Sequence, residues 1–241
     1  MPKIPKNPEQ IFQEFTNDYK STFGEDLIAI ILYGSAARGE YIYKKSDINF
    51  LIVLSGQGIN NLRRALPLIP KWKKKNVSTP LMLTQEYIQS ALDSFPVEFL
   101  TMKQHYRVVY GENVFEKIEI KPEHLRLQCE REMRGKLLYL REGYLNTNGK
   151  PAHIKRLISL SLPAFSSIFS ALLHLKNEEI PGSKQDIFLK TADVFKLDSK
   201  VFETILELKN KKSTLKKEQL YDLMEHFIEQ IAKLTDITDQ L

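Results

Sequence analysis

The chain has 241 residues, of which 42% are hydrophobic and 27% charged, and a formal net charge of +5. This length and composition can bury a sizeable core and suit one large or two small domains, of which we favour two. The single cysteine, Cys129, excludes an internal disulfide and a multi-cysteine zinc site and agrees with a reducing compartment. We expect a cytoplasmic protein with no membrane partner, because no signal peptide opens the chain and its apolar strand-like runs are far too short to span a bilayer.

The basic residues are concentrated at two places. Lys71 to Lys75 close a predicted helix, and several lysines between residues 209 and 217 surround a turn. Lysines at helix ends complement the helix dipole and keep surfaces solvated. No nucleic-acid motif accompanies them, so nucleic acid is not favoured as a partner.

The first half of the chain alternates helices and strands. Apolar residues spaced by three and four predict an amphipathic helix over residues 8 to 23, which ends at Gly24. Short runs rich in Ile, Leu and Val predict buried strands over 27 to 33 and 48 to 54, with a loop over 38 to 45 between them. A helix over 60 to 75 is interrupted by Pro67 and Pro70.

A third strand is predicted over 80 to 83, followed by a helix that Thr84 caps. We expect a fourth strand over 95 to 102. The stretch from 105 to 119 is consistent with a short helix or with a further strand, and both readings stay open.

From Pro122 onward the pattern is helical. A long apolar stripe predicts a helix from Pro122 to the turn at 146 to 151. Further helices are predicted over 152 to 175, 184 to 195, 199 to 209 and 216 to 234, with Pro163 as a kink in the first of these. The sequence therefore predicts an α/β domain over residues 1–121 and an all-helical domain over 122–241.

A Gly-Ser turn and two polar residues lie between the first two strands. Gly34 and Ser35 follow the first strand, and Asp47 and Asn49 stand two residues apart at the start of the second. Side chains two apart on a strand point the same way, so both should reach one site beside the turn. Gly lets backbone N–H groups approach phosphate oxygens, and a carboxylate such as Asp47 binds Mg²⁺.

This pattern resembles the nucleotidyltransferase superfamily, which includes DNA polymerase beta and the kanamycin-type aminoglycoside nucleotidyltransferases. Gly34-Ser35, a gap of roughly twelve residues and Ser46-Asp47-Ile48-Asn49 carry the resemblance. It implies an α+β fold, in which a mixed nucleotidyltransferase-fold sheet with flanking helices precedes an all-α helical bundle. The family has a third carboxylate on a later strand, and Glu98 is the best match.

The resemblance also implies an activity, namely transfer of a nucleotidyl group from a nucleoside triphosphate, ATP above all, to a hydroxyl of a small molecule or protein. Gly34, Ser35 and Arg38 would bind the phosphates, while Asp47, Asn49 and Glu98 would hold Mg²⁺. Glu130 is a candidate general base from the helical domain, against a plain ion pair with Arg134. A homodimer or a partner chain could form through that domain.

Asn49 departs from the family pattern, which has a second acid at its position. An amide offers a carbonyl oxygen to Mg²⁺ but no charge. Three readings therefore stay open: an active enzyme in which Glu98 compensates, a slow enzyme with one well-bound metal, and a nucleotide-binding or regulatory module without transfer.

Overall fold

The computed structural model describes residues 4–210 and 215–241. They form two compact units. The α/β unit comprises the chain up to Asp93 together with Phe99–Ile120, and the helical unit comprises Ser94–Glu98 and Lys121–Leu241. The short segment before Phe99 thus groups with the helical unit although it precedes β4 in the chain.

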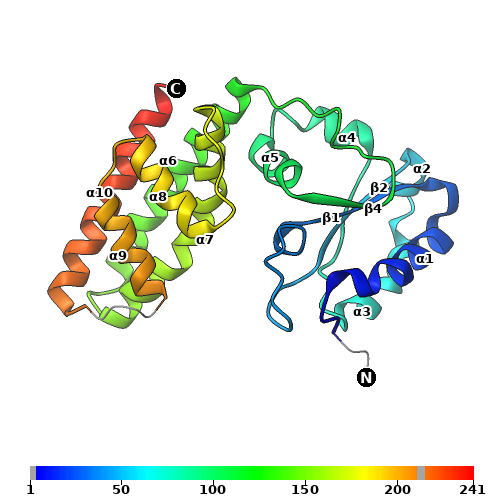
Figure 1. The fold of residues 1–241 in the computed structure, drawn as a ribbon, viewed down its shortest axis with the longest axis horizontal. Coiled ribbons are helices and arrows are strands. Elements are labelled where there is room, and N and C mark those ends of the chain that lie inside the picture. The colour runs from blue at the N-terminus through cyan, green and yellow to red at the C-terminus, as the bar shows by residue number, and fades with distance from the viewer. Residues whose placement is uncertain (1–3, 211–214) are drawn as a thin grey trace. The chain divides into compact units, whose positions relative to one another are not determined.

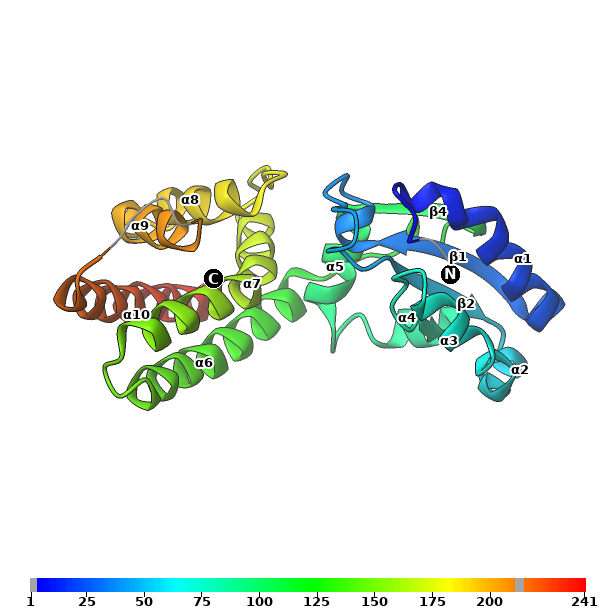
Figure 2. The same ribbon diagram turned by 90° about the horizontal axis from the view of Figure 1, so that it is seen from below.

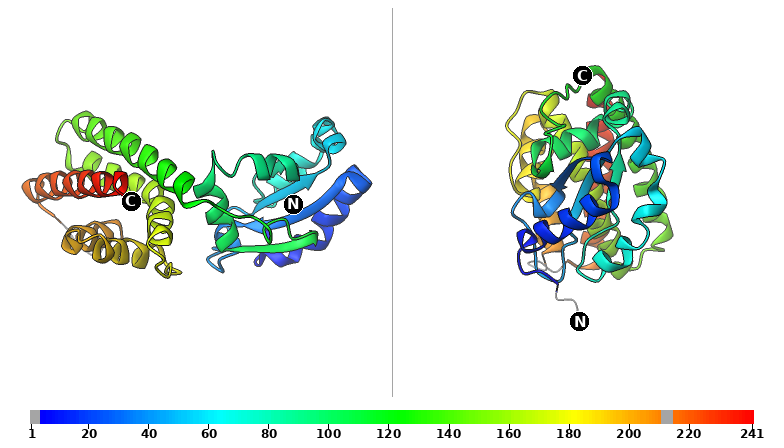
Figure 3. Two further views of the ribbon diagram at one scale, coloured as in Figure 1. Left: turned by 90° about the horizontal axis from the view of Figure 1, so that it is seen from above. Right: turned by 90° about the vertical axis from the view of Figure 1, so that its right-hand side faces the viewer.

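The α/β unit contains a mixed sheet of four strands, in the order β3-β2-β1-β4 (Figure 1). The strands are β1 (Leu27–Tyr33), β2 (Asn49–Leu54), β3 (Leu81–Leu83) and β4 (Tyr106–Gly111). β1 runs antiparallel to β2 and to β4, and β2 runs parallel to β3. β1 and β4 lie side by side in Figure 3. The strands predicted over 27–33, 48–54 and 80–83 are confirmed.

Helices cover both faces of this sheet. α1 (Phe12–Phe23) and α3 (Leu68–Lys73) lie on one face, where Phe15 stacks on Phe50 at 4.1 Å and meets Trp72 edge-on at 4.9 Å between ring centroids. The other face packs against α4 (Gln85–Ser90) and Phe99 of α5 (Pro96–Gln104). Strand residues alternate between these two cores, so each polar side chain at a strand end has a defined face.

The prediction of a strand over 95–102 is wrong, because this stretch forms the helix α5. Proline is favoured at the first helical position, where its fixed φ suits a helix and its missing N–H has no intrahelical role. Pro96 occupies this position. The stretch after residue 105, for which a helix and a strand were both open, contains the strand β4.

The interrupted helix predicted over 60–75 consists of a 3₁₀ turn, Leu62–Ala65, and of α3. The short helix α2 (Gly56–Ile59) precedes them. Thr84 caps α4 as predicted, with its hydroxyl accepting from Tyr87 N–H at 3.1 Å.

The helical unit contains the predicted helices. They are α6 (Pro122–Asn146), α7 (Pro151–Leu175), α8 (Lys184–Val194), α9 (Ser199–Lys209) and α10 (Lys217–Asp239). α7 and α10 both pack on α6 (Figure 2). Five phenylalanines from four helices form the core: Phe165, Phe169, Phe188, Phe202 and Phe227.

α7 is long and apolar enough to cross a membrane by length and composition alone, with a mean hydropathy of 1.6 over its most apolar window. In this structure 56% of that window is buried inside the protein. Its buried residues include Phe165 and Phe169, which contact aromatic rings of other helices in the unit. These contacts explain its hydropathy as that of a core helix.

Candidate functional site

The strand register brings the Gly-Ser turn and Asn49 to the same end of the sheet. Tyr33, the last residue of β1, pairs with Asn49, the first residue of β2, and also with Tyr106, the first of β4. A Cβ built on Gly34 would lie 3.2 Å from Asn49 Nδ2, so the Asn49 side chain lies directly against the turn. The sequence prediction that Asn49 faces the Gly-Ser turn is therefore consistent with the geometry.

The turn itself is a 3₁₀ helix, Gly34–Ala36, that begins where β1 ends. Gly34 has φ +77°, a conformation that favours glycine, and its carbonyl accepts from the N–H groups of Ala37 at 3.1 Å and Arg38 at 3.2 Å. The first N–H groups of a helical turn have no partner within the turn and point outward. Ser35 is half-buried at this position, where such groups can meet phosphate oxygens.

Asp47 has an exposed side chain on a fixed backbone. The residues on either side of it are held by Asn76: its side chain donates to Ser46 O at 2.9 Å, and its carbonyl accepts from Ile48 N–H at 2.9 Å. Ile48 and Phe50 are buried on the α1 side, so strand alternation places Asp47 and Asn49 on the opposite side. The backbone at Asp47 is thus fixed, while its exposed carboxylate is accessible to a ligand.

The other two strands bring no further carboxylate to Asp47 and Asn49. Neither β3 nor β4 contains one, and residues 76–79, which lead into β3 beside Ile48, are Asn, Val, Ser and Thr. The described residues contain no group of three or more His, Cys, Asp or Glu side chains that could hold a metal ion. The residues present therefore do not fit a pair of Mg²⁺ ions. They fit one Mg²⁺ bound through a single carboxylate and the phosphates of a nucleotide, which is a common arrangement.

Glu98 is not on a strand of the sheet, which corrects the placement on which its assignment as third metal ligand rested. It lies on α5, and its carboxylate accepts a hydrogen bond from Gln128 Nε2 of α6 at 2.8 Å. Gln128 is buried, and its side-chain oxygen also accepts from Val97 N–H at 2.8 Å. Glu98 thus takes part in a hydrogen-bonded connection within the helical unit.

Arg38 is held by an ion pair near the turn. Its Nε donates to Glu40 Oε2 at 3.0 Å. His105 is a neighbour that sequence reasoning missed. Burial lowers the pKa of His105, and the charge of Arg38 lowers it further while Glu40 opposes the shift. No sequence signal pointed to His105, because it comes near Arg38 only through the pairing of β1 with β4, in which Tyr33 pairs with Tyr106.

Glu130, the candidate general base, lies on α6 in an ion-pair set. Its two carboxylate oxygens accept from Arg126 at 3.0 Å and Arg134 at 2.8 Å. The hydrogen bonds from Arg134 and Arg126 lower the pKa of Glu130. A lowered pKa makes a weaker base, so these contacts favour the ion-pair reading, and the catalytic role of Glu130 stays a prediction.

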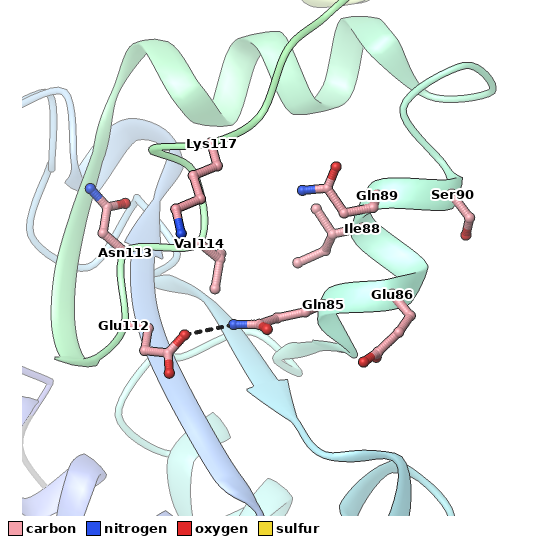
Figure 4. Close-up of a pocket in the computed structure, with 9 residues that line it drawn as sticks. All are labelled: Gln85, Glu86, Ile88, Gln89, Ser90, Glu112, Asn113, Val114 and Lys117. Carbon is pink, nitrogen blue, oxygen red and sulfur yellow. Dashed lines mark hydrogen bonds between the residues drawn. The ribbon is translucent and has the colours of Figure 1, made fainter.

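A cavity of about 710 Å³ lies elsewhere on the α/β unit, between α4 and the segment that follows β4 (Figure 4). Residues of 85–90 and 112–117 line it, and Gln85 Nε2 donates to Glu112 at 2.8 Å between the two segments. None of the lining residues belongs to the segment from Gly34 to Asn49. This cavity is therefore separate in its residues from the Gly-Ser turn.

No protein-family model matches the sequence, and a search of curated proteins finds no match. Among solved structures, the chain is similar to a spectinomycin adenyltransferase, AAD(9), from Enterococcus faecialis, crystallised with ATP and spectinomycin. The two chains are 13% identical with a TM-score of 0.53, and the match covers 94% of this chain and 100% of the other. The chain therefore has the nucleotidyltransferase fold, with a mixed sheet followed by a helical domain.

Proposed function

We propose that the protein binds a nucleoside triphosphate at the Gly34–Ser35 turn and transfers its nucleotidyl group to a hydroxyl of a small-molecule acceptor. The observation that carries this proposal is the closeness of the Asn49 amide to Gly34, which supports a shared site of Asn49, its neighbour Asp47 and a turn able to bind phosphate. The likeness to an adenyltransferase crystallised with ATP and spectinomycin supports ATP as the donor and a small molecule as the acceptor.

In this proposal the turn binds the phosphate tail through Ser35 and the N–H groups at its start. Asp47 supplies the one carboxylate to a Mg²⁺ that arrives with the triphosphate, and Asn49 can add its carbonyl oxygen. The metal supplies charge neutralisation on the phosphates. Arg38, held in place by Glu40, adds positive charge near the turn. We place the activity in the cytoplasm, where the buried and unpaired Cys129 stays reduced.

A second candidate is a nucleotide-binding module without transfer, which acts on a partner chain through its helical unit. The single carboxylate at the sheet edge favours this candidate, because in-line transfer with two metal ions needs more negative charge than Asp47 provides. The two candidates share the same nucleotide site and differ only in turnover.

The deciding experiment measures nucleotide binding by calorimetry and turnover with labelled triphosphates over a panel of hydroxyl acceptors. It uses the wild type, Asp47→Asn, Asn49→Asp and Glu98→Gln, with Asp222→Asn on exposed α10 surface as the matched control. We expect wild-type turnover that Asp47→Asn abolishes and Asp222→Asn leaves unchanged. We expect Asn49→Asp to tighten Mg²⁺ binding by about tenfold or more, since it adds a charge beside Asp47.

The outcomes separate the candidates. ATP binding without turnover in every variant, Asn49→Asp included, would assign the binding module. Loss of turnover in Glu98→Gln at unchanged ATP affinity would show that Glu98 takes part in the transfer reaction. A folded wild-type protein that binds no triphosphate would overturn both candidates.

A further inference from the structure

Tyr33 is the last residue of β1 and stands directly before Gly34 of the turn. Its backbone is still extended, with φ −141° and ψ 179°, so the strand alternation of side chains holds up to this residue. Residues that pair across antiparallel strands point to the same face, with their Cβ atoms about 4.5–5.5 Å apart. Tyr33 pairs with Asn49 of β2, so its side chain lies beside that of Asn49 on the same face.

The packing of the Tyr33 ring agrees with this orientation. The ring packs against the core that includes Ile31 of β1, Leu51 of β2 and Ile88 of α4. Leu51 lies two residues after Asn49 in the same strand and therefore points to the same face. The Tyr33 side chain is half-buried, so the core fixes the position of its ring.

The hydroxyl of Tyr33 is open. It has no hydrogen-bond partner within the part of the chain that the structure describes, and it is not sealed in the core either. Among the described residues, Tyr19 alone has a side-chain polar atom that is both buried and without a partner. Burial of the ring raises the pKa of Tyr33, so its hydroxyl stays protonated and acts as a hydrogen-bond donor at neutral pH.

A second tyrosine on the same row of side chains differs in its hydroxyl. Tyr106 of β4 pairs with Tyr33 on the side away from Asn49, and its ring meets Phe115 edge-on at 5.0 Å between centroids. The Tyr106 hydroxyl accepts a hydrogen bond from Asn113 Nδ2 at 3.0 Å. The row thus contains one tyrosine hydroxyl that is engaged within the protein, and an open one beside Asn49.

We propose that the Tyr33 hydroxyl donates a hydrogen bond to a phosphate oxygen of the nucleoside triphosphate bound at the Gly34–Ser35 turn. This inference rests on the proposed nucleotide site and holds for both candidate functions, which share that site. The residues present fit one Mg²⁺, and one dication leaves part of the negative charge of a triphosphate uncompensated. A hydroxyl that donates to a charged oxygen forms one of the stronger hydrogen bonds in proteins and stabilises this charge.

The position of Tyr33 favours the phosphates over the base and the ribose. Gly34, its neighbour in the chain, opens the turn to which phosphate binding is assigned. Asn49, its neighbour across the sheet, belongs with Asp47 to the residues assigned to Mg²⁺. Tyr33 therefore lies between the two groups that would hold the phosphates and their metal ion.

The first test is calorimetric titration of ATP with Mg²⁺ into the wild type, Tyr33→Phe and the matched control Tyr106→Phe. Tyr33→Phe keeps the ring that the core contacts and removes only the hydroxyl. We therefore expect a folded protein, checked by circular dichroism, whose ATP affinity is lower by about tenfold or more. Tyr106→Phe removes the engaged hydroxyl of the same row, and its affinity should stay within about twofold of the wild-type value.

The second test uses inorganic tripolyphosphate with Mg²⁺, which has the phosphate chain without base or ribose. Because the proposed hydrogen bond goes to a phosphate oxygen, Tyr33→Phe should lose affinity for tripolyphosphate by the same factor as for ATP. A loss with ATP alone would place the hydroxyl at the base or the ribose and overturn the proposal. Failure of the wild type to bind tripolyphosphate while it binds ATP would overturn it as well.

The results distinguish this inference from the proposed function. A wild type that binds ATP no better than Tyr33→Phe does would overturn the role of Tyr33 and leave the nucleotide site in place. Equal losses in Tyr33→Phe and Tyr106→Phe would also overturn that role, since the effect would then belong to the whole row. A folded wild-type protein that binds neither ATP nor tripolyphosphate would overturn the nucleotide site itself, and this inference with it.

Discussion

Ser35 occupies the second position of the turn after β1, half-buried and directly beside Gly34. We predict that Ser35→Leu lowers triphosphate affinity by at least about tenfold, because the larger side chain blocks the approach of phosphate to the N–H groups of the turn. The fold should remain, since Ser35 lies outside both cores of the α/β unit.

The measurement is calorimetric titration of ATP with Mg²⁺ into wild type, Ser35→Leu and the control Ser90→Leu, which changes an exposed serine of α4. Unchanged affinity in a folded Ser35→Leu protein would contradict the assignment of the turn to phosphate binding. The control should bind as the wild type does.

His105 gives a prediction about stability and pH. Its pKa is lowered in the folded state by burial and by Arg38, so between the folded pKa and about 6.5 the unfolded chain binds more protons. The contribution of His105 to the free energy of unfolding should therefore decrease as pH falls through about 6.5, and stay level at higher pH. Urea unfolding of wild type and His105→Gln, compared over this range, should show a difference that changes with pH. Parallel pH profiles of the two proteins would contradict a pH-dependent contribution of His105 to stability.

The position of Asn49 beside the Gly-Ser turn could be predicted from the sequence, because the two-residue strand period and the turn are local patterns. His105 could not, since it comes near Arg38 only through the pairing of β1 with β4, more than sixty residues apart in the chain. Positions that are close in the chain, such as Gly34 and Asn49 on adjacent strand ends, are thus predictable from local patterns, whereas neighbours that meet only across the sheet, such as Arg38 and His105, are not.

At the scale of elements, Gln128 connects α6 to the start of α5. We predict that Gln128→Leu destabilises the protein by about 1–3 kcal/mol, because the buried Val97 N–H loses its acceptor and Glu98 loses a donor. Chemical denaturation measures the change, with Gln185→Leu on exposed α8 as the control, which should stay within about 0.5 kcal/mol of wild type. An equal effect at both positions would contradict a specific role for Gln128.

The helices and strands with long, regular patterns were predicted correctly, and α5 was not. Val97 and Phe99 are both buried on either side of exposed Glu98, and this alternation over a short stretch is typical of a strand. In a helix of only nine residues such as α5, buried and exposed side chains can also alternate over a few positions. Pro96 at the first position was the local signal that distinguishes the two, and it carries more information than alternation over so few residues.

At the scale of the whole molecule, the two units have separate aromatic cores. Phe202 is fully buried beside Phe169, Phe188 and Phe227, whereas Phe15 is fully buried in the α/β unit. Each truncation to alanine should cost its own unit about 3–5 kcal/mol. We predict that Phe202→Ala lowers a different thermal transition from Phe15→Ala in calorimetry. A single transition that both variants lower equally would show that the units unfold together.

The buried state of Cys129 gives the helical unit a built-in reporter. Burial, with the nearby charges of Glu132 and Glu98, raises the pKa of this thiol to about 12, so in the folded protein it is neither exposed nor ionised. A thiol reagent can then react only when α6 detaches from its core, and the chain has no other cysteine to add background. The labelling rate of the untouched wild-type protein thus measures how often this unit opens, and ligand or self-association that tightens it would be read directly as slower labelling.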